Sequence, residues 1–166
     1  MSIESVAVSS IMKKEVKIAT ESQTIYTICK IMRDNNIGDV IIVKDFGIEP
    51  VGIITERDIV NQIALSPLSV QIPVRELMSK PLITIFLNSS IKDAIQTMQL
   101  KNIRRLLVVD NRRKMVGIIT DKDIFGAIMT NKDLLASLVS DQLLIEHRTV
   151  LERFNENIFS GIFPPR

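Results

Sequence analysis

One nine-residue stretch occurs twice in the chain, as VGIITERDI at 51–59 and as VGIITDKDI at 116–124. Seven of the nine positions are identical, and the other two exchange Glu for Asp and Arg for Lys. Self-similarity at a fixed separation indicates that one supersecondary unit has been used more than once. The chain is therefore expected to fold as two similar units, each built around this stretch.

The repeat extends well before the shared stretch. Met12 and Met78 correspond at a separation of 66, and each precedes a short extended segment, at 16–20 and 82–86. Thr24 and Ser90 follow as competent N-caps. The next apolar residues recur at i, i+3, i+4 and i+7, which predicts a helix in each half. These residues are Ile25, Ile28, Cys29 and Met32 in one half and Ile91, Ala94, Ile95 and Met98 in the other.

Each half continues with two short apolar runs that are typical of buried strands. The first runs lie at 40–43 and 106–109, and the second at 51–55 and 116–120. The turn between them is one residue longer in the first half, so the offset falls from 66 to 65. A second helix is expected from Glu56 and from Asp121. Each half thus reads as β-α-β-β-α.

These patterns predict an α/β (α+β) fold with two such repeats, at 8–66 and 67–130, and a helical extension at 131–166. A unit of about 60 residues buries too little surface to be stable alone. The two halves are therefore expected to cover each other's open sheet face. With 46% apolar residues and no Trp, the core is expected to be aliphatic.

Composition makes several classes of function less favoured. A net charge of +2 is too small to imply a nucleic-acid surface, since such binding neutralises several phosphates at once. The single Cys29 rules out an internal disulfide and a Cys-rich metal cluster. The N-terminus has no signal-peptide pattern, and no apolar run approaches the roughly 20 residues of a membrane span. A cytoplasmic protein without membrane contact is expected.

The shared motif is G-I-I-T-x-x-D, which comprises Gly52, Thr55 and Asp58 in one half and Gly117, Thr120 and Asp123 in the other. Thr-x-x-Asp at the start of a helix is close to a capping box, which by itself explains both polar residues. A carboxylate at that place also accepts two hydrogen bonds from vicinal hydroxyls. The helix N-terminus is expected to offer free N–H groups to a phosphate. Both interpretations stay open, because one Thr can serve as cap and as ligand contact.

The β-α-β-β-α repeat with this motif in both copies resembles a tandem pair of CBS domains, a Bateman module, over about residues 8–130. The resemblance implies two units that face each other through their sheets about a pseudo-twofold axis, with two clefts. It also implies an adenosyl ligand such as AMP, ADP, ATP or S-adenosylmethionine. Asp58 and Asp123 would then accept hydrogen bonds from a ribose diol, and Thr55 and Thr120 would face the ribose or phosphate.

The two expected nucleotide sites differ in charge. The second would be lined by Thr84, Arg104, Arg105, Leu106, Thr120 and Asp123. The first would be lined by Lys17, Ile18, Gly38, Asp39, Val40, Thr55 and Asp58. Because Asp39 repels a phosphate and the two arginines attract one, the second site is expected to bind a nucleotide better, and the first is expected to be weaker or suited to a less charged adenosyl ligand.

The chain has no nucleophile-base set, metal-ligand cluster or phosphate loop, so a non-enzymatic role without a required cofactor is expected. The resemblance implies a stand-alone sensor that acts on a partner protein. It also implies a homodimer through the second helices, about 56–63 and 121–129. The alternatives are an interaction module without a nucleotide and, more weakly, a nucleic-acid binder.

Overall fold

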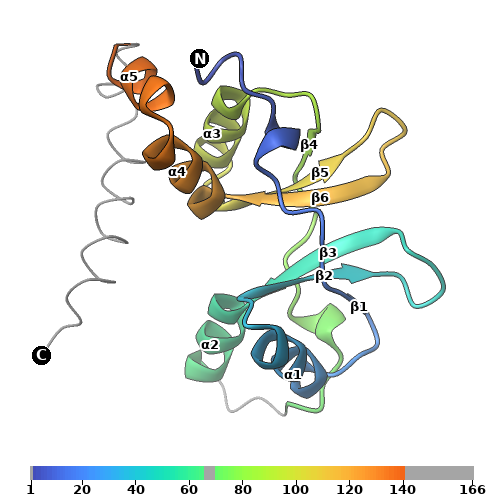
Figure 1. Cartoon of the computed structure of the whole chain (residues 1–166). Coiled ribbons are helices and arrows are strands. Elements are labelled where there is room, and N and C mark those ends of the chain that lie inside the picture. The colour runs from blue at the N-terminus through green and yellow to red at the C-terminus, as the bar shows by residue number, and fades with distance from the viewer. Residues whose placement is uncertain (1, 66–69, 141–166) are drawn as a thin grey trace, which may run out of the picture. The chain divides into compact units, whose positions relative to one another are not determined.

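The computed structural model describes residues 2–65 and 70–140 (Figure 1). The chain divides into two compact units. One spans Lys14–Thr84, and the other combines the N-terminal segment up to Lys13 with the chain from Ile85 onward.

The β-α-β-β-α order predicted for each half is confirmed. The first half comprises β1 (Ile18–Thr20), α1 (Ile25–Asn35), β2 (Asp39–Val43), β3 (Pro50–Thr55) and α2 (Glu56–Leu65). The second comprises β4 (Thr84–Phe86), α3 (Ile91–Leu100), β5 (Arg105–Val109), β6 (Met115–Thr120) and α4 (Asp121–Thr130). Each half forms a three-stranded sheet, ordered β1-β2-β3 and β4-β5-β6. β1 lies parallel to β2, and each later pair, β2–β3 and β5–β6, is antiparallel.

The residues at the two ends of α1 and of α3, the first helix of each half, account for where these helices start and stop. The Thr24 side chain accepts from the backbone N–H of Thr27, and Ser90 forms a capping box with Asp93. At the other end, Asn36 and Asn102 occupy equivalent places with φ of 52° and 51°. Asn tolerates the left-handed conformation that commonly ends a helix. The two helices therefore begin at the same register of the repeat, and each ends either directly before an Asn in the left-handed conformation or one residue earlier.

The core is aliphatic, as predicted. Among the described residues, the buried side chains are Ile, Val, Leu, Ala and Met, and no charged or polar residue is buried. Cys29 packs at the edge of the core of the first half, and burial raises the pKa of its thiol. This environment fits an inert core residue.

Each half is completed by a closing segment that precedes the other half in the chain. We use this term for residues 3–13 and 70–79. In the first of these, the Val8 N–H donates to the Ser89 carbonyl at 2.8 Å, so the dark blue segment lies beside α3 and β4 (Figure 1). In the second, the Val74 N–H donates to the Gln23 carbonyl at 2.8 Å. The boundaries of the two compact units therefore differ from those of the two sequence repeats.

The closing segments approach the strands most closely at the motif glycines. A Cβ on Gly117 would lie 2.6 Å from the Lys13 carbonyl oxygen, and one on Gly52 would lie 2.6 Å from the Met78 sulfur. Real Cβ atoms do not approach so closely, so a side chain at either place would displace the segment. The first obstacle is backbone, which yields less readily than the end of a methionine.

The chain continues after α4 into α5 (Lys132–Ser140), where the helical extension was predicted to begin. Leu134 is buried there. The remainder of the extension, including IFPPR, lies outside the described residues. None of the helices in the described ranges has the length and apolar character that a membrane crossing requires.

We predict that Gly117→Ala destabilises the protein by about 1–3 kcal/mol, the usual cost of overpacking, and that Gly52→Ala costs less. Gly126→Ala is the matched control, because that helical glycine has nothing within 4 Å of an added Cβ. The control should stabilise by roughly 0.5–1 kcal/mol. Urea unfolding measures all three, and a neutral Gly117→Ala would contradict the close approach.

Candidate functional site

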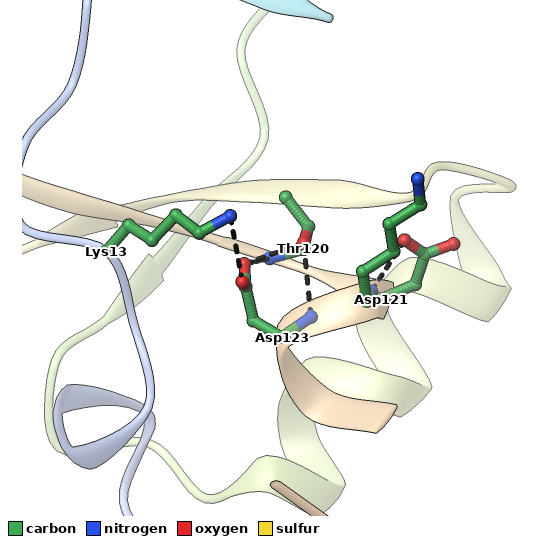
Figure 2. A network of polar contacts seen from close by, with 5 residues as sticks. Lys13, Thr120, Asp121 and Asp123 are labelled. Atoms are coloured by element: carbon green, nitrogen blue, oxygen red, sulfur yellow. Dashed lines mark hydrogen bonds and ion pairs between the residues drawn. The ribbon is translucent and has the colours of Figure 1, made fainter. Parts of the chain in front are cut away.

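The second motif forms a capping box at the junction of β6 and α4 (Figure 2). One oxygen of the Asp123 carboxylate, Oδ2, accepts from the Thr120 backbone N–H at 3.0 Å and from its hydroxyl at 2.6 Å. The Asp123 N–H donates to the Thr120 Oγ1 at 3.3 Å. These bonds fix the carboxylate at the first turn of the helix.

The first motif repeats this geometry at the junction of β3 and α2. Oδ2 of Asp58 accepts from the Thr55 N–H at 2.9 Å and from the Thr55 hydroxyl at 2.7 Å. The Asp58 N–H donates to the Thr55 Oγ1 at 3.2 Å. The capping interpretation of the motif is therefore confirmed in both halves. In each, Oδ1 of the carboxylate retains capacity for further donors.

The expectation of free N–H groups at the start of α4 is wrong. The Asp121 N–H donates to the Arg104 carbonyl at 3.0 Å, and the Lys122 N–H donates to Oδ1 of Asp121 at 2.8 Å. The Asp123 N–H is taken by the Thr120 hydroxyl. Since local acceptors satisfy the first turn, positive charge for an anion must come from side chains.

The predicted residues around the start of the second strand of each half do lie at the motif junction. Arg105 pairs with Thr120 across β5 and β6, and Asp39 pairs with Thr55 across β2 and β3. The preceding carbonyl, of Arg104 or Gly38, accepts from the first N–H of the second helix at 3.0 or 3.1 Å. The structure thus brings together these predicted residues and the Thr-x-x-Asp motif within each half.

A further charged residue at the second junction is Lys13, which was not among the residues predicted from the sequence. Its Nζ lies 3.1 Å from Oδ1 of Asp123 (Figure 2). The Lys13 side chain is 65% exposed and that of Asp123 is 12% exposed. The signal was present in the repeat, because Lys13 follows Met12 and corresponds to Ser79 after Met78.

The remaining predicted site residues differ in how far their side chains are exposed to a ligand. Val40 and Leu106 are 0% and 1% exposed, so only their backbone is available to a ligand. Ile18 is 42% exposed, and Thr84 is exposed at the start of β4. The Lys17 ammonium lies 2.6 Å from the Glu15 carboxylate and lowers the pKa of that group. Its charge is therefore partly offset.

No cluster of His, Cys, Asp or Glu suited to a metal ion occurs among the residues that the structure describes. The functional features of both junctions are a fixed carboxylate, a Thr hydroxyl and flanking charges. This arrangement suits recognition of a hydroxylated ligand.

The family follows from comparison with known proteins. The model of the CBS domain matches residues 8–65 and 74–130, so the chain belongs to the CBS domain family and carries a tandem pair of these domains. The CBS domain-containing protein YhcV of Bacillus subtilis is 30% identical over 87% of this chain and 98% of its own length. An uncharacterised protein of Methanopyrus kandleri is 36% identical over 74% of this chain.

The chain spans only part of the length of some relatives that it matches. The chain covers 62% of the Methanopyrus kandleri protein and 31% of a Methanocaldococcus jannaschii protein that is 34% identical.

Solved structures of CBS pairs have the same fold. The CBS domain pair of protein MJ0100, in complex with 5′-methylthioadenosine and S-adenosyl-L-methionine, is 30% identical with a TM-score of 0.66. It matches 75% of this chain and 97% of that chain. A conserved CBS domain protein of Thermoplasma acidophilum is 26% identical with a TM-score of 0.69, over 87% of this chain and 77% of that one. The α+β fold of two three-stranded sheets is thus that of a CBS pair.

We predict that Thr120→Ala destabilises the protein by about 0.5–2 kcal/mol, because α4 loses its N-cap. Thr120→Ser retains the hydroxyl and should cost much less. Chemical denaturation measures both. Equal losses in the two variants would contradict a capping role for the hydroxyl.

Proposed function

We propose that this protein is a regulatory sensor of adenosyl ligands, either adenine nucleotides of the AMP, ADP and ATP type or S-adenosylmethionine. The observation that carries the proposal is the pair of fixed carboxylates, Asp58 and Asp123, each at the same strand-to-helix junction. Each has one oxygen held by its Thr, and the other oxygen retains capacity for further donors. A ribose diol supplies two such donors, and ionised acceptors form the stronger hydrogen bonds.

The complex of the MJ0100 domain pair supports the ligand class. That protein is bound to two adenosyl compounds, and its identity of 30% extends over three quarters of this chain. On this basis the residues expected to surround a ligand are those of the two junctions. Val40 and Leu106 would contribute backbone only, because their side chains are buried.

Regulation requires a partner that reads the bound state. A ligand shifts a protein between two arrangements only by binding one of them better. We propose that the shift occurs within a homodimer and is transmitted to a regulated partner protein. The role is binding rather than catalysis, it needs no cofactor, and a cytoplasmic setting suits a ligand of this class.

One observation favours a second candidate, an interaction module without a nucleotide. Both Thr-x-x-Asp motifs are already satisfied as caps. If capping is their whole purpose, no adenosyl compound would bind. A nucleic-acid role stays the weakest alternative, because the net charge is only +2.

The ligand proposal is tested by titration calorimetry with AMP, ATP and S-adenosylmethionine. Asp58→Asn and Asp123→Asn replace an acceptor by an amide and should each weaken binding about tenfold or more, since a hydrogen bond to a charged group is worth roughly 1.5–3 kcal/mol.

Asp93→Asn is the matched control for that titration. Asp93 forms the same kind of capping box with Ser90 at the start of α3, a different helix from those of the two motifs. Binding should be unchanged in this variant. Undiminished binding in the double variant Asp58→Asn/Asp123→Asn would reject the proposed sites, and no binding by the unsubstituted protein would favour the interaction module.

The proposed dimer uses apolar residues that the second helices expose. Val60 and Ile63 on α2 are 62% and 50% exposed, and Met129 on α4 is 55% exposed. Such apolar groups on a surface commonly mark an interface. We predict a dimer in the native mass spectrum and a monomer for Val60→Asp/Ile63→Asp. Leu100→Asp, at an 82% exposed position on α3, should leave the dimer intact. Persistence of the dimer in the double variant would exclude this surface.

A further inference from the structure

The closing segments place one residue of each beside a motif junction, and the two residues differ in chemistry. Lys13 exchanges two backbone hydrogen bonds with Ile118 of β6, both of 2.9 Å. Ser79 exchanges the same two bonds with Ile53 of β3, at 2.8 and 3.0 Å. Because Ile118 and Ile53 are equivalent in the repeat, Lys13 and Ser79 occupy one structural position.

This position decides what surrounds the motif carboxylate. The Lys13 ammonium contacts Oδ1 of Asp123, the oxygen that the Thr120 cap leaves available (Figure 2). In the described part of the chain, Asp58 carries no such ion pair. The second carboxylate is thus paired with a cation, whereas the first has no ion pair among the described residues.

The other differences between the two junctions also make the second more positively charged than the first. At five equivalent positions the second junction has three cations and two carboxylates: Lys13, Arg104, Arg105, Asp121 and Asp123. The first has three carboxylates and no cation: Ser79, Gly38, Asp39, Glu56 and Asp58. The Glu56 carboxylate also lies over Gly38, since a Cβ there would be 3.1 Å from its Oε2.

The first three backbone N–H groups of α4 are not available to an anionic ligand. All three already have acceptors within the junction. An anionic ligand at this end of the fold is therefore recognised by side-chain charge. The Lys13 side chain is the most accessible partner of the carboxylate, at 65% exposure.

We propose that Lys13 is a specificity residue that makes the second-repeat site select phosphate-bearing adenosyl ligands. The first-repeat site, with Ser79 in its place, takes adenosyl ligands without phosphate. This inference rests on the proposed ligand-binding function and assigns different ligand classes to its two sites. Lys13 compensates the Asp123 carboxylate, so that a nearby phosphate meets net positive charge.

The test exchanges the two residues and varies only the phosphate number of the ligand. Lys13→Ser is measured in an Asp58→Asn background, which isolates the second site, with adenosine, AMP, ADP and ATP. Ser79→Lys is measured in an Asp123→Asn background, which isolates the first. Calorimetry at low and high salt gives each affinity, and thermal unfolding verifies that the variants are folded.

We expect Lys13→Ser to weaken ATP binding about tenfold, as for loss of one charge-assisted hydrogen bond, with a smaller salt dependence. Adenosine binding should change less than about twofold, because a neutral ligand gains little from the ammonium. Ser79→Lys should strengthen ATP binding at the first site. An affinity change that is limited to phosphate-bearing ligands would show that Lys13 selects the ligand and does not merely stabilise the fold.

Three results would overturn this inference alone: unchanged or tighter ATP binding in Lys13→Ser, equal losses for adenosine and ATP, or no gain in Ser79→Lys. Absence of binding by every ligand to the unsubstituted chain would overturn the proposed function as well. The two failures are therefore distinguishable.

Discussion

The contact between each closing segment and the strand glycine of a motif is the constraint on which the rest of the structure depends. Gly52 and Gly117 leave no room for a Cβ, so the segment backbone can pair directly with β3 or β6. This pairing completes the core of each half with residues that lie far away in sequence. It also sets Ser79 or Lys13 beside the junction where the strand passes into a helix. The same glycines thus serve packing and define the surroundings of the motif carboxylates.

At the junctions, the residues that cap the helix are also those of the proposed ligand site. A Thr hydroxyl and a carboxylate oxygen close the first turn of the helix, which accounts for their spacing without any ligand. The second carboxylate oxygen is not needed for the cap. Its surroundings are therefore free to differ between the halves, and they do differ in charge. Two repeats of one fold with different charges at their junctions are the basis of the proposal that each takes its own ligand class.

The fold could be read from the sequence because its signals are local and occur twice. N-caps at Thr24 and Ser90 mark helix starts that the structure confirms. The repeat also located the Thr-x-x-Asp junctions. Lys13 was missed because the closing segment crosses to the other half, a tertiary pairing that no local pattern encodes. The acceptor of the Asp121 N–H was missed for a related reason, since the Arg104 carbonyl reaches that group only once β5 and β6 have paired.

The central claim, that the capped junctions also contact an adenosyl ligand, is tested most directly by amide hydrogen exchange with and without saturating ATP. Peptides that cover 52–60 and 117–125 report the two junctions, and the start of α3 at 88–96 is the internal reference. The account predicts slower exchange at the second junction and no change at the reference. Slowed exchange elsewhere, with both junctions unaffected while ATP is bound, would contradict it.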